Sequence, residues 1–218
     1  MTTSAVLFDI DGTLVDSTYH HAVAWLRAFA RLTDVPPMWR VHRSIGMGGD
    51  RLVAEVADDE TEERYGDDLR DAWREEYLEL RAEVRPLPGA SELVRLLARE
   101  GHVVALASSG DPQFAREAVD LLGIGSDIAE LVTSQDVDAS KPAPDLVQET
   151  LDRLGDVDNA VLVGDTVYDV RSAEAAGIGC VALRSGGFGR AELLESGALR
   201  VEEVPGDLLG LDWVPGRS

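Results

Sequence analysis

The sequence is poor in lysine, cysteine and long apolar runs. Of its 20 basic residues, 19 are arginine, and Lys141 is the only lysine among 218 residues. The lone Cys180 permits no internal disulfide, which favours a reducing compartment such as the cytoplasm. No run of 18 consecutive apolar residues occurs, so we expect no membrane span. The first residues have no basic segment ahead of a short apolar run, so we expect no signal peptide.

Positive charge is also scarce. Asp and Glu number 41 against 20 Lys and Arg, which gives a formal net charge of −21. Such a surface repels nucleic-acid phosphates and anionic lipids, so we expect neither nucleic acid nor membrane as a partner. Solubility is the simplest reason for the charge, and adaptation to salt is an alternative. A general preference for arginine explains why lysine is rare, but not where the one lysine lies.

Short apolar segments alternate with helical patterns along most of the chain. The apolar segments lack a clean two-residue alternation, which is typical of strands buried on both faces of a parallel sheet. They are residues 4–11, 102–109, 159–165 and 180–185, with a poorer one at 128–134. Helical patterns lie between them, at residues 91–100, 111–123, 143–155 and 168–177, and end at or just before glycine. This order predicts an α/β fold with a Rossmann-like, mainly parallel sheet and right-handed crossovers.

Residues 16–86 interrupt this alternation. They contain several segments with helical periodicity and no convincing strand, so we expect an inserted α-helical domain. The insertion begins just after the first strand and returns at "RPLPGA", where two prolines and a glycine suit a stiff hinge. Residues 1–15 and 87–218 are expected to form the catalytic core.

Polar residues follow the expected strands, at the sheet edge where open α/β folds bind ligands. They are Asp9, Asp11, Ser108, Ser109, Lys141, Asp165 and Asp169. Four carboxylates and one ammonium carry a net charge of −3. Two like charges about 4 Å apart repel by roughly 4 kcal/mol at an effective dielectric near 20, so the cluster needs a cation or a proton. A ligand set made only of oxygen points to a hard ion, and Mg²⁺ is the usual one beside phosphate.

Four segments of the sequence carry a resemblance to a known family. "DIDGTLVDS", "ALASS", "SKPAPD" and "VLVGDTVYD" are similar, in this order, to the four motifs of the haloacid dehalogenase superfamily in its phosphatase branch. The insertion lies where that family carries a helical cap. The resemblance implies a Mg²⁺-dependent phosphomonoester hydrolase that acts on a small soluble phosphorylated metabolite through an aspartyl-phosphate.

The resemblance also implies roles for the acidic residues. Asp9 would be the nucleophile, and Asp11 would be the general acid and then the general base. Asp9, the backbone carbonyl of Asp11, and Asp165 would hold Mg²⁺. Asp169 would bind the metal through water or orient its neighbours. The alternative for Asp169 is a solvent-exposed charge on a helix, with no part in the site.

Further roles concern the phosphate and the single lysine. Ser108, Ser109 and Lys141 would bind phosphate, with the Lys141 ammonium neutralising Asp9 and the transferring phosphoryl group. Arginine is a poor substitute there, because its guanidinium is a broad planar fork and not a compact charge. Thr13 would fix the position of Asp11. Ser108 has an alternative role as a helix cap.

The insertion offers candidates for substrate contact. The resemblance suggests that His21 approaches the active site, and a packed or solvent-facing histidine is the alternative. The glycine-rich stretch "HRSIGMGGDR" resembles the substrate-specificity loop of helical caps, which includes Gly46. Arg43 or Arg51 could bind an anionic substrate there, although a surface charge is the simpler interpretation of each.

Two other functions compete with hydrolysis. A phosphosugar mutase of the β-phosphoglucomutase type shares the two catalytic aspartates, but Gly48 or Gly49 stands at the position of its loop arginine and the insertion contains no lysine. A phosphoaspartate receiver domain gathers similar residues, but it is shorter and lacks a helical insertion. The sequence does not identify the phosphate ester, and both a monomer and a small homo-oligomer fit it.

Overall fold

A parallel six-stranded sheet forms the centre of the computed structural model, which describes residues 4–211 and 213. Its strands are β1 (Ser4–Phe8), β2 (Val103–Ala107), β3 (Glu130–Val132), β4 (Asn159–Gly164), β5 (Gly179–Leu183) and β6 (Arg200–Glu202). The strand order is β3-β2-β1-β4-β5-β6, with every neighbouring pair parallel. This is the Rossmann-like α/β core that the alternating sequence pattern predicts.

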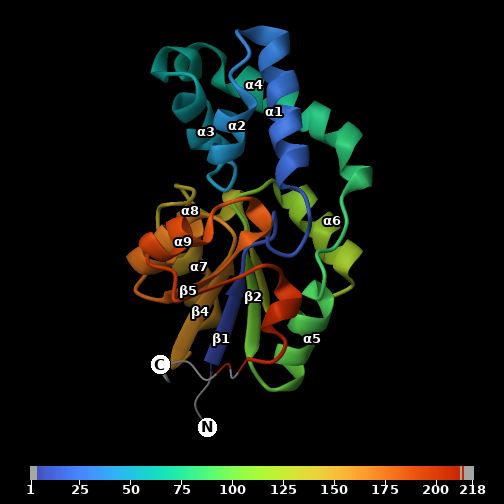
Figure 1. Cartoon of the computed structure of the whole chain (residues 1–218), viewed down its shortest axis with the longest axis vertical. Helices are drawn as coiled ribbons and strands as arrows, with labels where there is room; N and C mark the ends of the chain where they lie inside the picture. The colour runs from blue at the N-terminus through green and yellow to red at the C-terminus, as the bar shows by residue number, and fades with distance from the viewer. Residues whose placement is uncertain (1–3, 212, 214–218) are drawn as a thin grey trace.

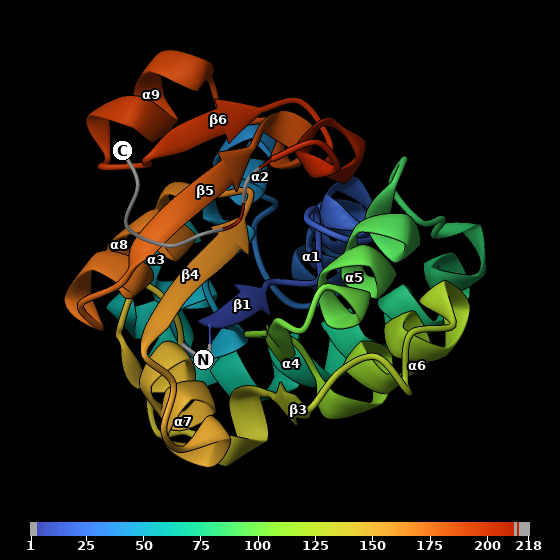
Figure 2. The same ribbon diagram turned by 90° about the horizontal axis from the view of Figure 1, so that it is seen from below.

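Helices cover both faces of the sheet (Figure 2). Alternate residues of β1 point to opposite faces, so that Val6 and Phe8 join one hydrophobic cluster and Ala5 and Leu7 join another. The first cluster includes α5 (Ala90–Arg99) and α6 (Pro112–Leu122), and the second includes α7 (Asp145–Leu154), α8 (Val167–Ala175) and α9 (Arg190–Glu195). Both faces of β1 are therefore buried, which explains its lack of polar alternation.

Four helices lie above the carboxyl ends of the strands (Figure 1). They are α1 (Thr18–Leu32), α2 (Met38–Ser44), α3 (Gly49–Val56) and α4 (Asp59–Leu80), followed by the short helix η1 (Arg81–Glu83). We call residues 18–83 the helical layer. It has a hydrophobic cluster of its own, which includes Trp25, Phe29 and Leu69.

The two connections to the helical layer run side by side. The Asp16 N–H donates to the Arg85 carbonyl at 2.8 Å, and the Leu87 N–H donates to the Leu14 carbonyl at 2.9 Å. The chain therefore leaves and re-enters the sheet layer at one place, where the sequence suggested a hinge.

Local signals in the sequence account for several helix ends. The Asp111 side chain accepts from the Gln113 N–H at the start of α6, and Gly123 ends that helix with a φ of +63°. β6 and α9, which have only 3 and 6 residues, were not expected from the sequence. Three short helices, η2 (Ser134–Asp136), η3 (Arg184–Gly186) and η4 (Pro205–Leu208), were also not expected.

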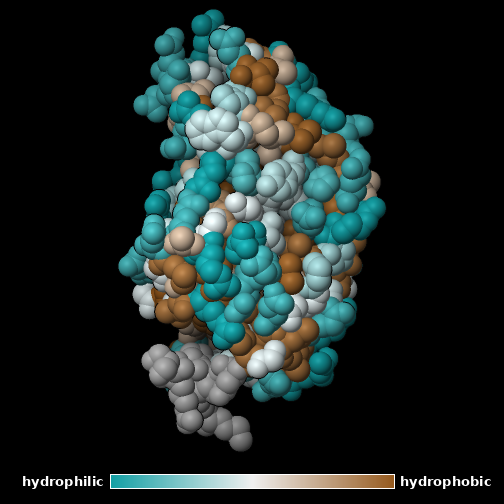
Figure 3. Space-filling view, viewed as in Figure 1, coloured by the Kyte–Doolittle hydropathy of each residue, from teal (hydrophilic) through white to brown (hydrophobic). Residues whose placement is uncertain are grey.

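Hydrophilic residues are spread over the face shown in Figure 3, between smaller hydrophobic areas, in keeping with the net charge of −21. Across residues 4–211 and 213, none of the helices has the length and apolar character that crossing a membrane requires.

Candidate active site

Asp9 and Asp165 follow the two strands at which the strand order reverses. From β1 the chain continues through β2 and β3 on one side, then crosses to β4 and continues through β5 and β6 on the other side. Open α/β sheets bind ligands at this point, beyond the carboxyl ends of the strands. Asp9 directly follows β1 and donates its backbone N–H to the Val163 carbonyl at 2.9 Å, and Asp165 directly follows β4. The sheet therefore brings two distant carboxylates to one place.

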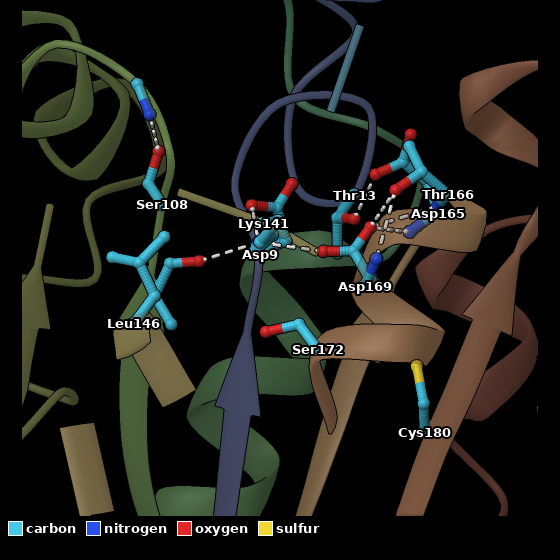
Figure 4. A network of polar contacts seen from close by, with 12 residues as sticks. Asp9, Thr13, Ser108, Lys141, Leu146, Asp165, Thr166, Asp169, Ser172 and Cys180 are labelled. Carbon is cyan, nitrogen blue, oxygen red and sulfur yellow. Dashed lines mark hydrogen bonds and ion pairs between the residues drawn. The ribbon is translucent and has the colours of Figure 1, made fainter. Parts of the chain in front are cut away.

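Lys141 is fully buried and lies between these elements. Its ammonium lies 2.5 Å from Asp9 Oδ1, 2.7 Å from Asp169 Oδ1 and 2.9 Å from the Ala107 carbonyl oxygen. Figure 4 shows Lys141 and Asp9 facing Asp169. These contacts are two hydrogen bonds, to Asp9 and Ala107, and an ion pair with Asp169. Burial lowers the pKa of Lys141, but Asp169 and Asp9 outweigh it and raise the net pKa, so Lys141 stays charged.

Asp9 and Asp165 are buried carboxyl groups with raised pKa values. Burial is the largest cause for both, and repulsion from Asp169 adds to it. The pKa of Asp9 rises to about 7, although Lys141 opposes the shift. Thr13 Oγ1 donates to Asp165 Oδ1 at 2.7 Å, so Thr13 orients Asp165 and not Asp11, contrary to the sequence-based expectation. Such a pair requires protons or an added cation to remain buried.

The residues present fit a divalent cation. Asp9, Asp165 and Asp169 each offer a carboxylate oxygen, and these oxygens lie within 4.8 Å of one another. Asp165 Oδ2 is buried and finds no hydrogen-bond partner in the described chain. Backbone encloses this oxygen closely, since a Cβ at Gly186 would lie only 1.8 Å from it. An all-oxygen set with an unpartnered buried carboxylate oxygen suits Mg²⁺.

Asp169 differs from the other two carboxylates, because both of its oxygens already have partners. Oδ2 accepts from the Thr166 hydroxyl at 2.6 Å, the Thr166 N–H at 3.0 Å and the Asp165 N–H at 3.2 Å. Oδ1 faces the Lys141 ammonium. A metal ion bound directly to Asp169 would compete with these contacts, so its geometry suits an orienting residue better than a metal ligand.

Asp11 is held by two residues at the start of α1. The Ser17 hydroxyl donates to Asp11 Oδ1 at 2.6 Å, and His21 Nε2 lies 2.9 Å from the same oxygen. The His21 ring stacks on Tyr77, with 4.0 Å between ring centroids. Burial raises the pKa of Asp11, but His21 and Ser17 outweigh it and hold the net pKa below its usual value. Ser17 was not predicted from the sequence, where its one signal is its place four residues before His21.

A cavity of about 380 Å³ opens onto Asp9 and Asp11 beneath the helical layer. Ser109 lines the cavity, and its hydroxyl is buried without a hydrogen-bond partner in the described chain. The Ser108 hydroxyl accepts from the Gly110 N–H at 3.0 Å and does not line the cavity. Of the two serines expected to bind phosphate, Ser109 therefore has the free hydroxyl.

The loop between α2 and α3 lies directly on the core. Gly46 lines the cavity with a φ of +107°, and a Cβ there would lie 2.6 Å from Thr166 Cγ2. A Cβ at Gly48 would lie 2.1 Å from Ser140 Oγ. Because these two positions have no side chain, the loop can approach Ser140, next to Lys141, and Thr166, next to Asp165.

Neither arginine expected near the substrate lines this cavity. Arg43 pairs with Glu192 and lies 4.0 Å from the centroid of the Phe188 ring. Arg51 is half exposed, and its Nε lies 3.8 Å from Asp50. This position gives no support to the sequence-based suggestion that one of them binds an anionic substrate. Glu192, the partner of Arg43, lies outside the cavity lining, whereas Asp50, the neighbour of Arg51, is part of it.

The chain is similar to known proteins over most of its length. Residues 3–177 match the family model of the haloacid dehalogenase-like hydrolases. A phosphoglycolate phosphatase of Rhodospirillum rubrum is 32% identical over 96% of this chain and 90% of its own length. An N-acetylmuramic acid 6-phosphate phosphatase of Pseudomonas aeruginosa is 29% identical over 85% of this chain and 84% of its own. The crystal structure of a hydrolase from Pseudomonas syringae superposes with a TM-score of 0.88 at 33% identity, covering 95% of this chain and 96% of that one.

Proposed function

The chain belongs to the haloacid dehalogenase-like hydrolase family, in its phosphatase branch, and from that premise we propose how its residues hydrolyse a phosphomonoester. The membership removes the receiver-domain alternative. The relatives named as phosphatases favour hydrolysis over isomerisation. Particular side chains at the carboxyl end of the sheet are proposed to carry out nucleophilic attack, proton transfer and charge neutralisation.

Asp9 is the proposed nucleophile. It lies at the end of β1, at the bottom of the cavity, with one oxygen held by Lys141 at 2.5 Å. This contact orients the carboxylate and leaves its second oxygen available to attack phosphorus. The attack forms an aspartyl-phosphate and expels the alcohol, so a difficult hydrolysis is divided into two steps.

Asp11 is the proposed general acid and base. It lines the same cavity two residues after Asp9, and it gives a proton to the leaving alkoxide and later takes one from the attacking water. His21 Nε2, 2.9 Å from Asp11 Oδ1, holds the carboxyl group in position for both proton transfers. Ser17 fixes the same oxygen.

Lys141 and a divalent cation together balance the negative charge. We propose Mg²⁺ as the cofactor, held by Asp9, Asp165 and the Asp11 backbone carbonyl. When bound, it neutralises phosphate oxygens and so stabilises the charge of the transition state. Asp169 orients Lys141, and Ser109 with the neighbouring backbone N–H groups receives the phosphate. Preorganised charges of this kind contribute most to phosphoryl transfer.

Residues 16–86, which include the helical layer, are proposed to be a substrate-specificity cap, with the core formed by residues 1–15 and 87–218. It closes the cavity over Asp9 and Asp11, which limits the substrate to a small soluble phosphorylated metabolite and excludes bulk water. The buried, unpaired Cys180 and the acidic surface fit a cytoplasmic enzyme, and we place the protein there.

The single observation that carries this proposal is the meeting of Asp9, Lys141 and Asp165 at the end of the sheet. Its test is release of phosphate from p-nitrophenyl phosphate with Mg²⁺, with EDTA, and with Mg²⁺ restored after EDTA. We expect turnover, its loss and its recovery. Turnover that is indifferent to EDTA would remove the metal from the mechanism, and absence of turnover under all conditions would refute the function.

A further inference from the structure

The cavity has a polarity that indicates which alcohol it accepts. We infer that the substrate is the phosphate ester of an uncharged alcohol with several hydroxyl groups and one apolar face, such as a sugar or polyol. Phosphoglycolate, whose alcohol carries a carboxylate, is then a poor substrate. This inference rests on the proposed phosphatase function and concerns the part of the cavity beyond Asp9 and Asp11.

Acidic residues dominate that part of the cavity. Four carboxylates line it in addition to Asp9 and Asp11, namely Asp50, Asp71, Asp111 and Asp138. They come from α3, α4, the start of α6 and the loop before Lys141, so they surround the space and are not one solvated helix face. A second negative charge on the substrate would be repelled chiefly by Asp71 and Asp138, because Asp111 is paired with Arg74 and Asp50 lies 3.8 Å from Arg51.

The two arginines of the cavity wall are already occupied. Arg70 donates to Glu62 at 2.9 Å, to Asp67 at 2.9 Å and to the Gly49 carbonyl at 3.0 Å. Arg74 donates to Asp111 at 2.7 Å and to Gln113 at 2.6 Å. A substrate carboxylate would have to displace one of these acidic partners to find a cation.

The single lysine offers no alternative. Lys141 is buried, donates hydrogen bonds to Asp9 and Ala107, and forms an ion pair with Asp169. Among the residues that the structure describes, the cavity lining therefore provides no unpaired lysine or arginine for a second anion.

Other residues of the lining suit an uncharged group. Trp25 and Trp73 both line the cavity and stack with 5.4 Å between ring centroids, and Ile45 and Leu52 add apolar surface. The indole N–H of Trp73 is buried and has no acceptor within residues 4–211 and 213. An indole face packs well against the C–H face of a sugar ring, and its N–H donates to a hydroxyl oxygen.

The acidic side chains complete this pattern. A carboxylate accepts hydrogen bonds from hydroxyl groups without needing a counter-charge on the substrate. A polyol presents several such donors, and the cavity of about 380 Å³ accommodates a small metabolite. The carboxylates and the indole N–H can therefore hydrogen-bond an alcohol with many hydroxyl groups, whereas the carboxylates repel an alcohol that carries a carboxylate.

The test compares kcat/KM for hexose 6-phosphate, glycerol 2-phosphate and phosphoglycolate under one set of conditions, with p-nitrophenyl phosphate as the reporter of catalysis. We expect at least a tenfold higher kcat/KM for the better polyol phosphate than for phosphoglycolate. If the aryl phosphate is hydrolysed and phosphoglycolate matches or exceeds both polyol phosphates, this inference fails while the phosphatase function stands. If no substrate is hydrolysed, the proposed function itself fails, and the inference with it.

Variants separate charge from other effects. Asp71→Asn and Asp138→Asn each remove one cavity charge, so the ratio of kcat/KM for phosphoglycolate to that for glycerol 2-phosphate should rise about three- to tenfold. Glu174→Gln removes an exposed charge on α8 outside the cavity lining and should leave this ratio unchanged. If this ratio rises equally in all three variants, or does not rise in Asp71→Asn and Asp138→Asn, repulsion by the cavity carboxylates does not determine the choice of substrate.

Trp73→Phe tests the apolar face and its donor. Phenylalanine keeps an aromatic ring in the stack but removes the N–H, so KM for hexose 6-phosphate should rise about threefold or more while kcat changes little. A rise in KM of the same size for p-nitrophenyl phosphate would show a general packing defect and contradict a role in binding hydroxyl groups.

Discussion

The ammonium of Lys141, the only lysine in the chain, lies 2.5 Å from the carboxylate of Asp9 and 2.7 Å from that of Asp169. Its third donor reaches the Ala107 carbonyl at 2.9 Å. The side chain is fully buried, so these contacts are made in a poorly solvated space where unpaired charge is costly. The position requires a compact cation with three separate donors, which explains why lysine persists here in an arginine-rich sequence.

Lys141→Arg should therefore impair the enzyme strongly. A planar guanidinium cannot direct donors at Asp9, Asp169 and Ala107 at these distances, and its added bulk displaces Asp9. We expect kcat/KM for p-nitrophenyl phosphate to fall at least 100-fold. Arg116→Lys, a reciprocal change at an exposed site, should have no effect. A Lys141→Arg enzyme with near-normal kcat/KM would mean that the location of the lysine is a coincidence.

Metal binding should depend on pH in a definite direction. Burial raises the pKa of Asp9 from 3.8 to about 7. In the metal-free protein, the folded state therefore loses stability as the pH rises from about 4 to 7, because Asp9 must ionise while it is buried. Mg²⁺ needs the ionised form and competes with protons. Its affinity should fall by about tenfold per pH unit below pH 7 for each proton displaced.

Thermal unfolding measures this effect. The rise in Tm on adding Mg²⁺ should be larger at pH 7.5 than at pH 5.5, and Asp165→Asn should abolish most of the rise at both pH values. An equal rise at the two pH values, or one that persists in Asp165→Asn, would contradict this assignment of the metal site.

His21→Asn should alter the pH dependence of turnover. His21 and Ser17 hold the pKa of Asp11 below its usual value against the effect of burial, so loss of His21 raises that pKa. More Asp11 is then protonated at low pH, and less is available as the base that activates water. For an aryl phosphate, whose leaving group needs little protonation, the acidic limb of the kcat profile should move to higher pH. An unmoved limb with a uniformly lower kcat would reduce His21 to a packing role.

Gly48→Ala tests the approach of the helical layer to the core. A Cβ at position 48 would lie 2.1 Å from Ser140 Oγ and 2.3 Å from Asp50 Oδ1, so the loop has to withdraw from the site. We expect kcat/KM to fall about tenfold with little change in Tm. Gly189→Ala is the matched control, since a Cβ there meets no atom within 4 Å. If both variants behave like the natural protein, contact of this loop with Ser140 is not needed for turnover.

Much of the fold was predictable because its signals are local. The strands of the sheet centre are buried on both faces and form continuous apolar segments, and α6 has both an Asp cap and a terminal glycine. β6 and α9 escaped prediction because an edge strand of 3 residues and a helix of 6 residues carry too little pattern.

The site was less predictable, because it depends on contacts between distant segments. The acids at the strand ends stand out in the sequence, but the partners of their side chains do not. Thr13 lies two residues from Asp11, yet its hydroxyl reaches Asp165, which is 152 positions away. Arg43 lies beside a glycine-rich stretch, yet it pairs with Glu192, which is 149 positions away. Cavity polarity likewise depends on which acids neutralise the arginines of the cavity wall.

The central claim is that a phosphoryl group passes through Asp9. The test uses the Asp11→Asn protein, in which hydrolysis of the phosphoenzyme should be slow. The protein is mixed with p-nitrophenyl phosphate and Mg²⁺ and then quenched in acid. Reduction with borohydride then converts an aspartyl-phosphate to homoserine. Peptide mass spectrometry should then locate one homoserine, at position 9. Absence of any modified peptide during turnover, or a phosphoryl group on Ser108, Ser109 or another residue, would contradict the mechanism.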